Sequence, residues 1–198
     1  MGALPEDTRR GQPARRRAAR RMVWLSGTVL AGALGAIASE DVTMPVTLTS
    51  SAFTEGAAIP STYTCEGRDV SPPLAWTDPP AGTKGFALIG DDPDAPGQTW
   101  VHWVLYNLPP SARRLPEAVS PEQELPDGAR QGRTDFGRIG YGGPCPPSGT
   151  HRYFFKLYAL DAMLSLPPGA TKSQLEAAMK GHVLAEAQLM GTYRRQGR

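Results

Sequence analysis

Residues 99–108 read TWVHWVLYNL, a run of aromatic and β-branched side chains without a break. Such a run, bounded by Gly-Gln on one side and Pro-Pro on the other, predicts a strand that is buried on at least one face. Strict alternation along this strand places four side chains on one face: Trp100, His102, Val104 and Tyr106. Val101 and Trp103 are then expected on the opposite face.

Outward from this run, three more segments have strand character: MPVTLTS (44–50), FALIGDD (86–92) and RYFFKLYALD (152–161). In the last of these, His151, Tyr153 and Phe155 share a face if the strand begins at His151. The loops between the runs are rich in proline and glycine, of which the chain holds 20 and 22, and this favours turns and short strands over long helices. The sequence therefore predicts a mainly β fold, a β-sandwich with peripheral helices.

Helix signals come late in the chain, between residues 171 and 195. Apolar side chains recur there at helical spacing, at Leu175, Met179, Val183, Ala187 and Met190. Thr171 and Gln174 fit a capping box at the start. Gly181 divides the run, so we expect short C-terminal helices, with His182 and Tyr193 on the second.

Residues 1–38 have the layout of a targeting segment. A basic stretch is followed by the apolar run 23–38, which ends in the small-x-small pattern Ala36-Ile37-Ala38. A cleaved signal, an uncleaved anchor over residues 22–38, and a start codon assigned too early are all compatible with it. The first reading gives a leader over 1–38 and an exported domain, periplasmic or secreted, over 39–198.

The charge of the chain belongs mostly to that leader. Residues 1–38 hold seven Arg and two acidic residues, a net of +5, whereas the whole chain is +2, so residues 39–198 carry −3. A mildly acidic domain argues against nucleic-acid binding, which needs clustered cations. The domain contains both cysteines, Cys65 and Cys145, and in an exported protein an even count favours a disulfide over two separate thiols.

Polar groups suited to binding stand at three predicted strand ends. Asp91, Asp92 and Asp94 lie in DDPDAP (91–96), where two prolines end the strand. His102 lies near the start of the run quoted first. His151 follows YGGPCPPSGT (141–150), a loop stiffened by three prolines. A lone histidine is more often a core residue, but two of the three histidines fall at these points, which favours a shared site.

Together these stretches resemble the phosphatidylethanolamine-binding protein family, in its bacterial Raf kinase inhibitor-like branch. The matching segments include LTSSAFTEGAAIPSTYTCEG, SPPLAW, DDPDAP, WVHWVLYNLP, DFGRIGYGGPCPPSGTHRYFFKLYALD and LMGTYRR, in order from about Leu48 to Arg195. Ser148 and Thr150 stand where the family more often has proline and histidine. These two departures bear on the contacts that the rim of the site makes with a ligand.

The resemblance implies two antiparallel sheets in a Greek-key sandwich and a small pocket for anions, such as phosphate or a phospholipid headgroup, with no enzymatic activity and no cofactor. The ligand-binding residues it implies are Asp92, Asp94, Pro96, Trp100, His102, Gly143, Cys145, Pro146, His151 and Tyr153. We expect the rigid loop to offer backbone N–H groups to the ligand. We also expect Asp92 either to pair with a histidine or to be protonated, since a bare carboxylate repels an anion.

Other functions use the same residues. A protein-partner inhibitor of a kinase or protease could employ the same pocket. A zinc site could use His102, His151 and Cys145, although no Cys-x-x-Cys is present. A hydrolase could use Cys145 with a histidine as nucleophile and base, although no Gly-x-Ser-x-Gly elbow is present.

Overall fold

The computed structural model describes residues 45–196, and the predicted leader lies outside these residues. The described elements are, in order, β1 (Leu48–Thr49), the 3-10 turn η1 (Ser61–Tyr63), β2 (Leu74–Trp76), β3 (Gly85–Asp92), β4 (Trp100–Leu108), β5 (Arg114–Leu115), β6 (Arg130–Gln131), β7 (Thr150–Leu160), α1 (Lys172–Met179) and β8 (Val183–Arg194). Within this part of the chain, no helix has the length and apolar character that crossing a membrane requires.

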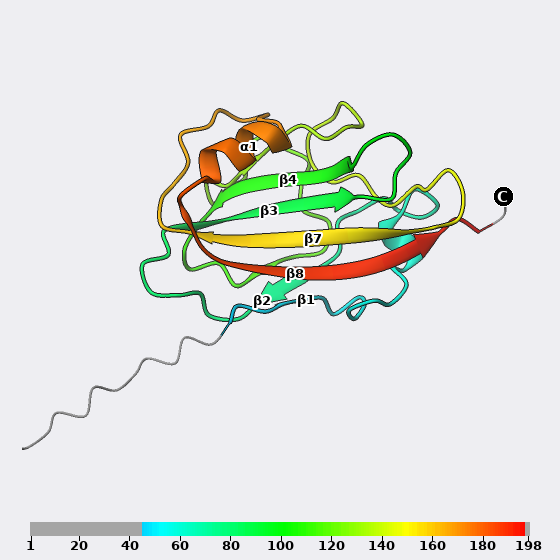
Figure 1. Ribbon diagram of the computed structural model, residues 1–198, viewed down its shortest axis with the longest axis horizontal. Helices are drawn as coiled ribbons and strands as arrows, with labels where there is room; N and C mark the ends of the chain where they lie inside the picture. Colours follow the sequence, from blue (N-terminus) through cyan, green and yellow to red (C-terminus); the bar gives the residue numbers. More distant parts are fainter. Residues whose placement is uncertain (1–44, 197–198) are drawn as a thin grey trace, which may run out of the picture. The chain divides into compact units, whose positions relative to one another are not determined.

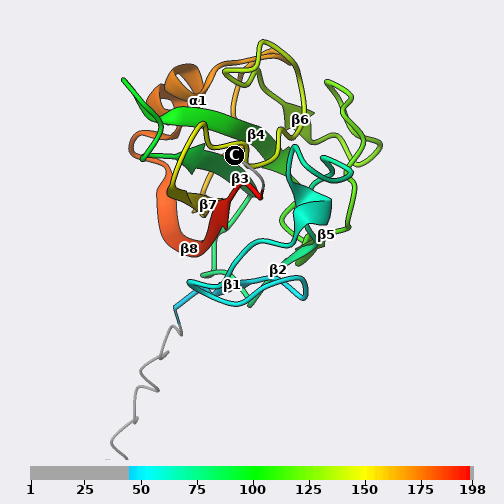
Figure 2. The ribbon, with the colours of Figure 1, turned by 90° about the vertical axis from the view of Figure 1, so that its right-hand side faces the viewer.

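The strands form two antiparallel sheets, as the family resemblance implied. A small sheet has the order β1-β2-β5, and a large sheet has the order β6-β4-β3-β7-β8. Figure 2 shows the two layers, with β1, β2 and β5 below the long strands. The larger apolar core lies between the layers and includes Trp76, Phe86, Trp103 and Phe155.

Strand β3 is buried along its whole length because both of its faces are covered. Phe86 and Leu88 face the core between the sheets, whereas Ala87 and Ile89 face a second core under α1. Leu175 of α1 is completely buried there. Alternation along β3 thus sends Asp92 to the inner face and Asp91 to the helix side.

The C-terminal helix was predicted too long. Helix α1 begins with the expected capping box of Thr171 and Gln174, but it ends at Met179. Gly181 then adopts a left-handed φ of 84°, and β8 pairs with β7 over its full length (Figure 1). Residues 183–190 are rich in good helix formers such as alanine, leucine, glutamate and glutamine. Their local preference therefore led to the wrong prediction of a helix. The long partner strand β7 overrides that preference through ladder hydrogen bonds and burial of Leu189 and Tyr193.

The prediction for His182 is wrong for the same reason. His182 lies in the turn before β8, where its Nδ1 is 2.7 Å from Oδ1 of Asp161 on the surface. Tyr193 lies on β8, and its hydroxyl hydrogen-bonds the Glu66 carboxylate at 2.5 Å. This hydroxyl is therefore engaged by Glu66.

Candidate functional site

A β-bulge in β4 turns His102 toward the inner face of the large sheet. Gly90 pairs with Trp103, but the next residue, Asp91, pairs with Val101, so His102 is the extra residue. A bulge interrupts alternation and re-aims side chains. Val101 therefore packs under α1 with Val104, whereas the His102 ring meets the Tyr153 ring edge-on at 5.2 Å.

Strict alternation was thus the wrong prediction for this strand. Trp100 and His102 line a pocket, while Val104 and Tyr106 belong to the core under the helix. The prediction for β7 is confirmed: Tyr153 and Phe155 share the inner face, and His151 is buried at the start of the same strand.

The pocket has a volume of about 290 Å³ and lies where the end of β3 meets the starts of β4 and β7. It is lined by Asp92, Ala95, Pro96, Trp100, His102, Phe136, Cys145 and Pro147. Most of this lining is apolar or aromatic, and polar groups come from Asp92 and His102. Among residues 45–196, neither a lysine nor an arginine lines it.

His151 and Asp92 form a buried pair behind this pocket. The His151 Nδ1 lies 2.7 Å from Oδ2 of Asp92, and the two side chains are 9% and 4% exposed. The other carboxylate oxygen, Oδ1, accepts the N–H of Asp94 at 2.8 Å. Both carboxylate oxygens are therefore engaged. This is the first of the two arrangements expected for Asp92, pairing with a histidine.

His102 is oriented by a backbone carbonyl instead. Its Nδ1 lies 2.6 Å from the carbonyl oxygen of Gly142. A carbonyl can only accept, so Nδ1 carries the proton and the neutral ring keeps Nε2 as an acceptor. Burial holds the pKa of His102 below its usual range, against the opposing effects of that hydrogen bond and of nearby carboxylates, Asp92 first.

Two buried donors next to the pocket lack hydrogen-bond partners among the described residues: the Tyr153 hydroxyl and the Trp100 indole N–H. Tyr153 is 3% exposed. Its hydroxyl lies near the Asp92 carboxylate and the Cys145 backbone without good hydrogen-bond geometry, and burial, with the charge of Asp92, raises its pKa. Buried donors are normally paired, so two unpaired donors beside one pocket are unusual.

The rigid loop does not present its N–H groups as expected. The Gly142 N–H donates to the His102 carbonyl at 2.8 Å, and the Gly143 N–H donates to Oδ1 of Asp69 at 2.6 Å. Pro144, Pro146 and Pro147 have no N–H, so among residues 142–147 only the N–H of Cys145 is left. Gly143 is required for packing, because an added Cβ would lie 2.5 Å from the carbonyl oxygen of Tyr63.

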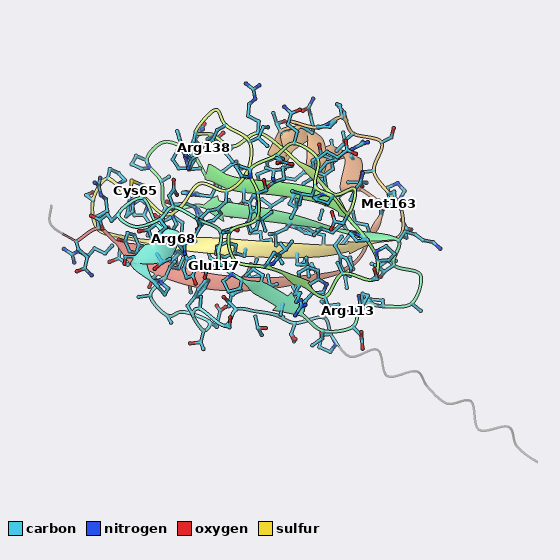
Figure 3. The ribbon with its side chains drawn as sticks, turned by 180° about the vertical axis from the view of Figure 1, so that it is seen from behind. Cys65, Arg68, Arg113, Glu117, Arg138 and Met163 are labelled. Atoms are coloured by element: carbon cyan, nitrogen blue, oxygen red, sulfur yellow. A yellow bond between two sulfur atoms is a disulfide. The ribbon has the colours of Figure 1, made fainter. Side chains whose placement is uncertain are left out.

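Cys65 and Cys145 form a disulfide across 80 residues. The bridge fixes the loop to the segment around η1, where the Cys65 N–H also donates to the Pro144 carbonyl at 3.1 Å. Figure 3 shows Cys65 and Arg138 toward the same end of the molecule. A bridged sulfur is neither a thiolate ligand nor a nucleophile, which removes Cys145 from the zinc and hydrolase alternatives in this state. Among residues 45–196, no group of three His, Cys, Asp or Glu side chains is arranged to hold a metal ion.

The other implied residues lie around the pocket in different roles. Pro96 lines the pocket, whereas Pro146 is a buried residue of the loop and does not line it. Asp94 turns away toward Arg152, whose guanidinium donates to both carboxylate oxygens at 2.7 and 2.9 Å. These hydrogen bonds lower the pKa of Asp94 to about 2. Asp94 thus fastens the loop after β3 to β7.

A larger hollow of about 550 Å³ lies over β7 and β8, lined by Lys156, Tyr158, Glu186, Ala187 and Gln188. None of these residues is buried. The smaller pocket is therefore the better candidate, because it combines buried histidines, a buried carboxylate and unpartnered donors.

Comparison with known proteins agrees with this geometry. The family model described as phosphatidylethanolamine-binding protein matches residues 49–194. The chain belongs to the phosphatidylethanolamine-binding protein family.

The chain is similar to proteins from archaea and bacteria. It is 55% identical over 148 residues to a UPF0098 protein of Methanothermobacter thermautotrophicus, covering 75% of this chain and 98% of the relative. A UPF0098 protein of Aquifex aeolicus is 51% identical over 149 residues, covering 74% and 86%.

Two crystal structures are similar to the chain. A putative phosphatidylethanolamine-binding protein homolog, CT736, from Chlamydia trachomatis has a TM-score of 0.71 at 44% identity, covering 77% of this chain and 99% of that one. Escherichia coli YbcL, described as a new member of the mammalian PEBP family, has a TM-score of 0.72 at 33% identity, covering 77% and 100%. The matched part is 99% and 100% of these two structures, so each of them consists of this domain alone.

Two lining residues of this family member were missed in the sequence, Ala95 and Phe136, whereas Pro147 belongs to the segment 143–147 that the resemblance implies as a wall of the pocket. Ala95 adjoins Pro96, which was predicted. Phe136 lies in a loop between β6 and β7, and its neighbours in sequence carry no signal of a pocket. Only the folded chain brings its ring to 5.6 Å from Trp100 and 5.2 Å from His102.

Proposed function

We propose that the pocket binds a small anionic phospho-ligand, a phosphate or a phosphorylated headgroup, without transforming it. The observation that carries this proposal is the cluster of donors around one small hollow. The Tyr153 hydroxyl and the Trp100 N–H are buried without partners among the described residues, and two buried histidines stand beside them. Phosphate oxygens accept several hydrogen bonds at once, which suits such a cluster.

The charge of the site sets the expected strength of binding. Asp92 is neighboured by His151, and in the part of the chain that the structure describes neither a lysine nor an arginine lines the pocket. The site therefore depends on hydrogen bonds and on histidine protons rather than on a fixed positive field, and we expect modest affinity for a bare phosphate. The aromatic and proline walls suit an apolar extension of the ligand.

Calorimetric titration of the portion from Ser39 onward with inorganic phosphate and with phosphoethanolamine, near pH 6, tests the proposal. We expect binding in the parent that is lost in His102→Ala and in His151→Ala while both variants stay folded. Absence of binding in the parent would contradict it and would favour the protein-partner function.

Export is proposed with the same domain. The disulfide between Cys65 and Cys145 supports it, because such bridges persist in oxidising compartments. N-terminal sequencing of protein recovered from outside the cytoplasm tests it, and a start near Ser39 is the expected result. Recovery of only cytoplasmic protein with reduced cysteines would contradict it.

A further inference from the structure

Phe136 forms one wall of the pocket from the tip of a tight turn. The Gly137 N–H donates to the Thr134 carbonyl, and the Thr134 N–H donates to the Arg138 carbonyl, each at 3.0 Å. The ring is 40% exposed, yet its inner side contacts the edges of Trp100 and His102. The ring has room because residue 142 is glycine, where an added Cβ would lie 2.5 Å from Cδ2 of Phe136.

An arginine also contacts this ring. The guanidinium carbon of Arg138 lies 5.5 Å from the centroid of Phe136, a cation–π contact. Nη2 of Arg138 in turn donates to Oδ2 of Asp69 at 2.6 Å. The second oxygen of Asp69 accepts the Gly143 N–H.

Asp69 has an uncommon backbone conformation for a residue with a side chain, with φ of 53°. In this conformation one carboxylate reaches two parts of the loop between β6 and β7, one through Arg138 and the other through Gly143. Such left-handed residues persist where the surrounding contacts hold them. Asp69 thus joins two walls of the pocket, one bearing Phe136 and one bearing Cys145.

The other walls leave little freedom. Cys145 is bridged to Cys65, Pro96 and Pro147 have fixed φ, and Trp100 belongs to a strand. Phe136 differs because its ring lies on a turn and is held by side-chain contacts.

We propose that Phe136 sets the size of headgroup that the pocket accepts, and that Asp69 and Arg138 are positioning residues that hold its ring in place. The inference rests on the proposed function for its ligand, and it adds the residues that decide which phospho-ligand fits. Replacing the Phe136 ring with a smaller side chain makes room for a bulkier headgroup. Removing the Arg138 guanidinium has a smaller effect of the same kind, because the ring can then move away from the ligand.

The test compares three probes that share a phosphate and differ in bulk: inorganic phosphate, phosphoethanolamine and phosphocholine. The measured quantity is the ratio of the Kd for phosphocholine to that for phosphate, by calorimetry on the portion from Ser39 onward. In Phe136→Ala we expect this ratio to fall by about tenfold, the low end of what one methylene-sized clash costs. In Arg138→Gln and Asp69→Asn we expect a fall of roughly two- to fivefold, the size of one exposed cation–π contact. The Asp69→Asn change keeps an acceptor for the Gly143 N–H while removing the charge that holds Arg138.

Arg113→Gln is the matched control. It breaks another exposed arginine–aspartate pair, between Arg113 and Asp78 at 2.8 Å, which lies toward the opposite end of the molecule from Arg138 (Figure 3). The ratio should stay at the parent value in this variant. Phe136→Leu is the conservative variant and should restore part of the parent selectivity. A ratio unchanged in Phe136→Ala, in a parent that binds phosphate, overturns the inference.

A second measurement needs no ligand and keeps the inference testable if the proposed function fails. The Phe136 ring covers His102, whose pKa is lowered by burial. Removing the ring should move the pKa of His102 upward toward about 6.5, as followed by NMR of the imidazole. The carboxylates that act on His102 are those of Asp92, Asp91 and Asp69, and all three remain in Phe136→Ala. If the parent binds none of the probes, the proposed function is contradicted, and a His102 pKa unchanged in Phe136→Ala then overturns the inference about the wall as well.

Discussion

The imidazole of His151 lies against the carboxylate of Asp92, with Nδ1 and Oδ2 2.7 Å apart and both side chains buried. The pair joins the end of β3 to the start of β7, two neighbouring strands of the large sheet. His102 is the histidine that lines the pocket, so the charge presented to an anion there changes when the His102 imidazole gains a proton.

We predict that anion affinity rises as pH falls below about 6.5, because the His102 imidazole gains a proton there and burial holds its pKa below the usual range. A bound anion favours the charged imidazole, so binding and protonation support one another. Sulfate is the suitable probe, since its own charge stays constant over this range. Calorimetry at several pH values gives the slope of affinity against pH, which should flatten in His102→Asn. An affinity for sulfate that is independent of pH would contradict the prediction.

The stability of the free protein should move the other way with pH. Burial lowers the pKa of His102 in the folded state, whereas an unfolded histidine titrates near about 6.5. Between these two values the unfolded chain binds more protons, so this contribution to the free energy of unfolding is lost as pH falls below about 6.5. Urea unfolding at about pH 7.5 and pH 5 should show a smaller loss on acidification in His102→Asn than in the parent. An equal loss in both proteins would show that His102 does not contribute.

A second buried carboxylate, Asp91, is held by two lysines on the helix side of β3. Its side chain is fully buried, and it lies 2.9 Å from the Nζ of Lys156 and 2.5 Å from that of Lys172. Each lysine can compensate for the loss of the other, so Lys156→Met and Lys172→Met should each be mild. The double variant leaves the carboxylate unpaired and should lower the free energy of unfolding by about 3–5 kcal/mol.

Urea unfolding of the four proteins completes this double-mutant cycle. The double variant should lose more than the sum of the single losses. Additive losses would mean that the two lysines do not share Asp91. Lys84→Met, which removes a solvent-exposed lysine, is the control.

The disulfide should contribute strongly to stability. It closes a segment of 80 residues between Cys65 and Cys145, and a bridge over a long segment restricts the unfolded chain. Cys65→Ala/Cys145→Ala should lower the free energy of unfolding by about 2–5 kcal/mol in urea. The reduced parent should unfold at the same urea concentration as this variant. If Cys65→Ala/Cys145→Ala unfolded at the same urea concentration as the oxidised parent, the prediction would be contradicted.

The sequence by itself determined the positions of most of the strands and the segments that hold the pocket residues. The runs at 86–92, 99–108 and 152–161 are β-prone and are bounded by proline and glycine, and all three became long strands of the large sheet. The capping box at Thr171 also formed, because it depends on residues three positions apart. The segments that resembled the family held the residues that surround the pocket, since the resemblance covered nearly the whole domain.

The tertiary structure decided what depends on partners far away in the chain. Residues 183–194 became a strand because β7 offered an edge, although their local preference is helical. The bulge at His102 exists only relative to the register with β3, so alternation along one strand could not show it. Phe136 entered the pocket through contacts with Trp100 and Arg138, and the Gly143 N–H was taken by Asp69. Short-range patterns fix backbone preferences, whereas register, side-chain direction and the pairing of each buried polar group are settled only when distant segments pack together.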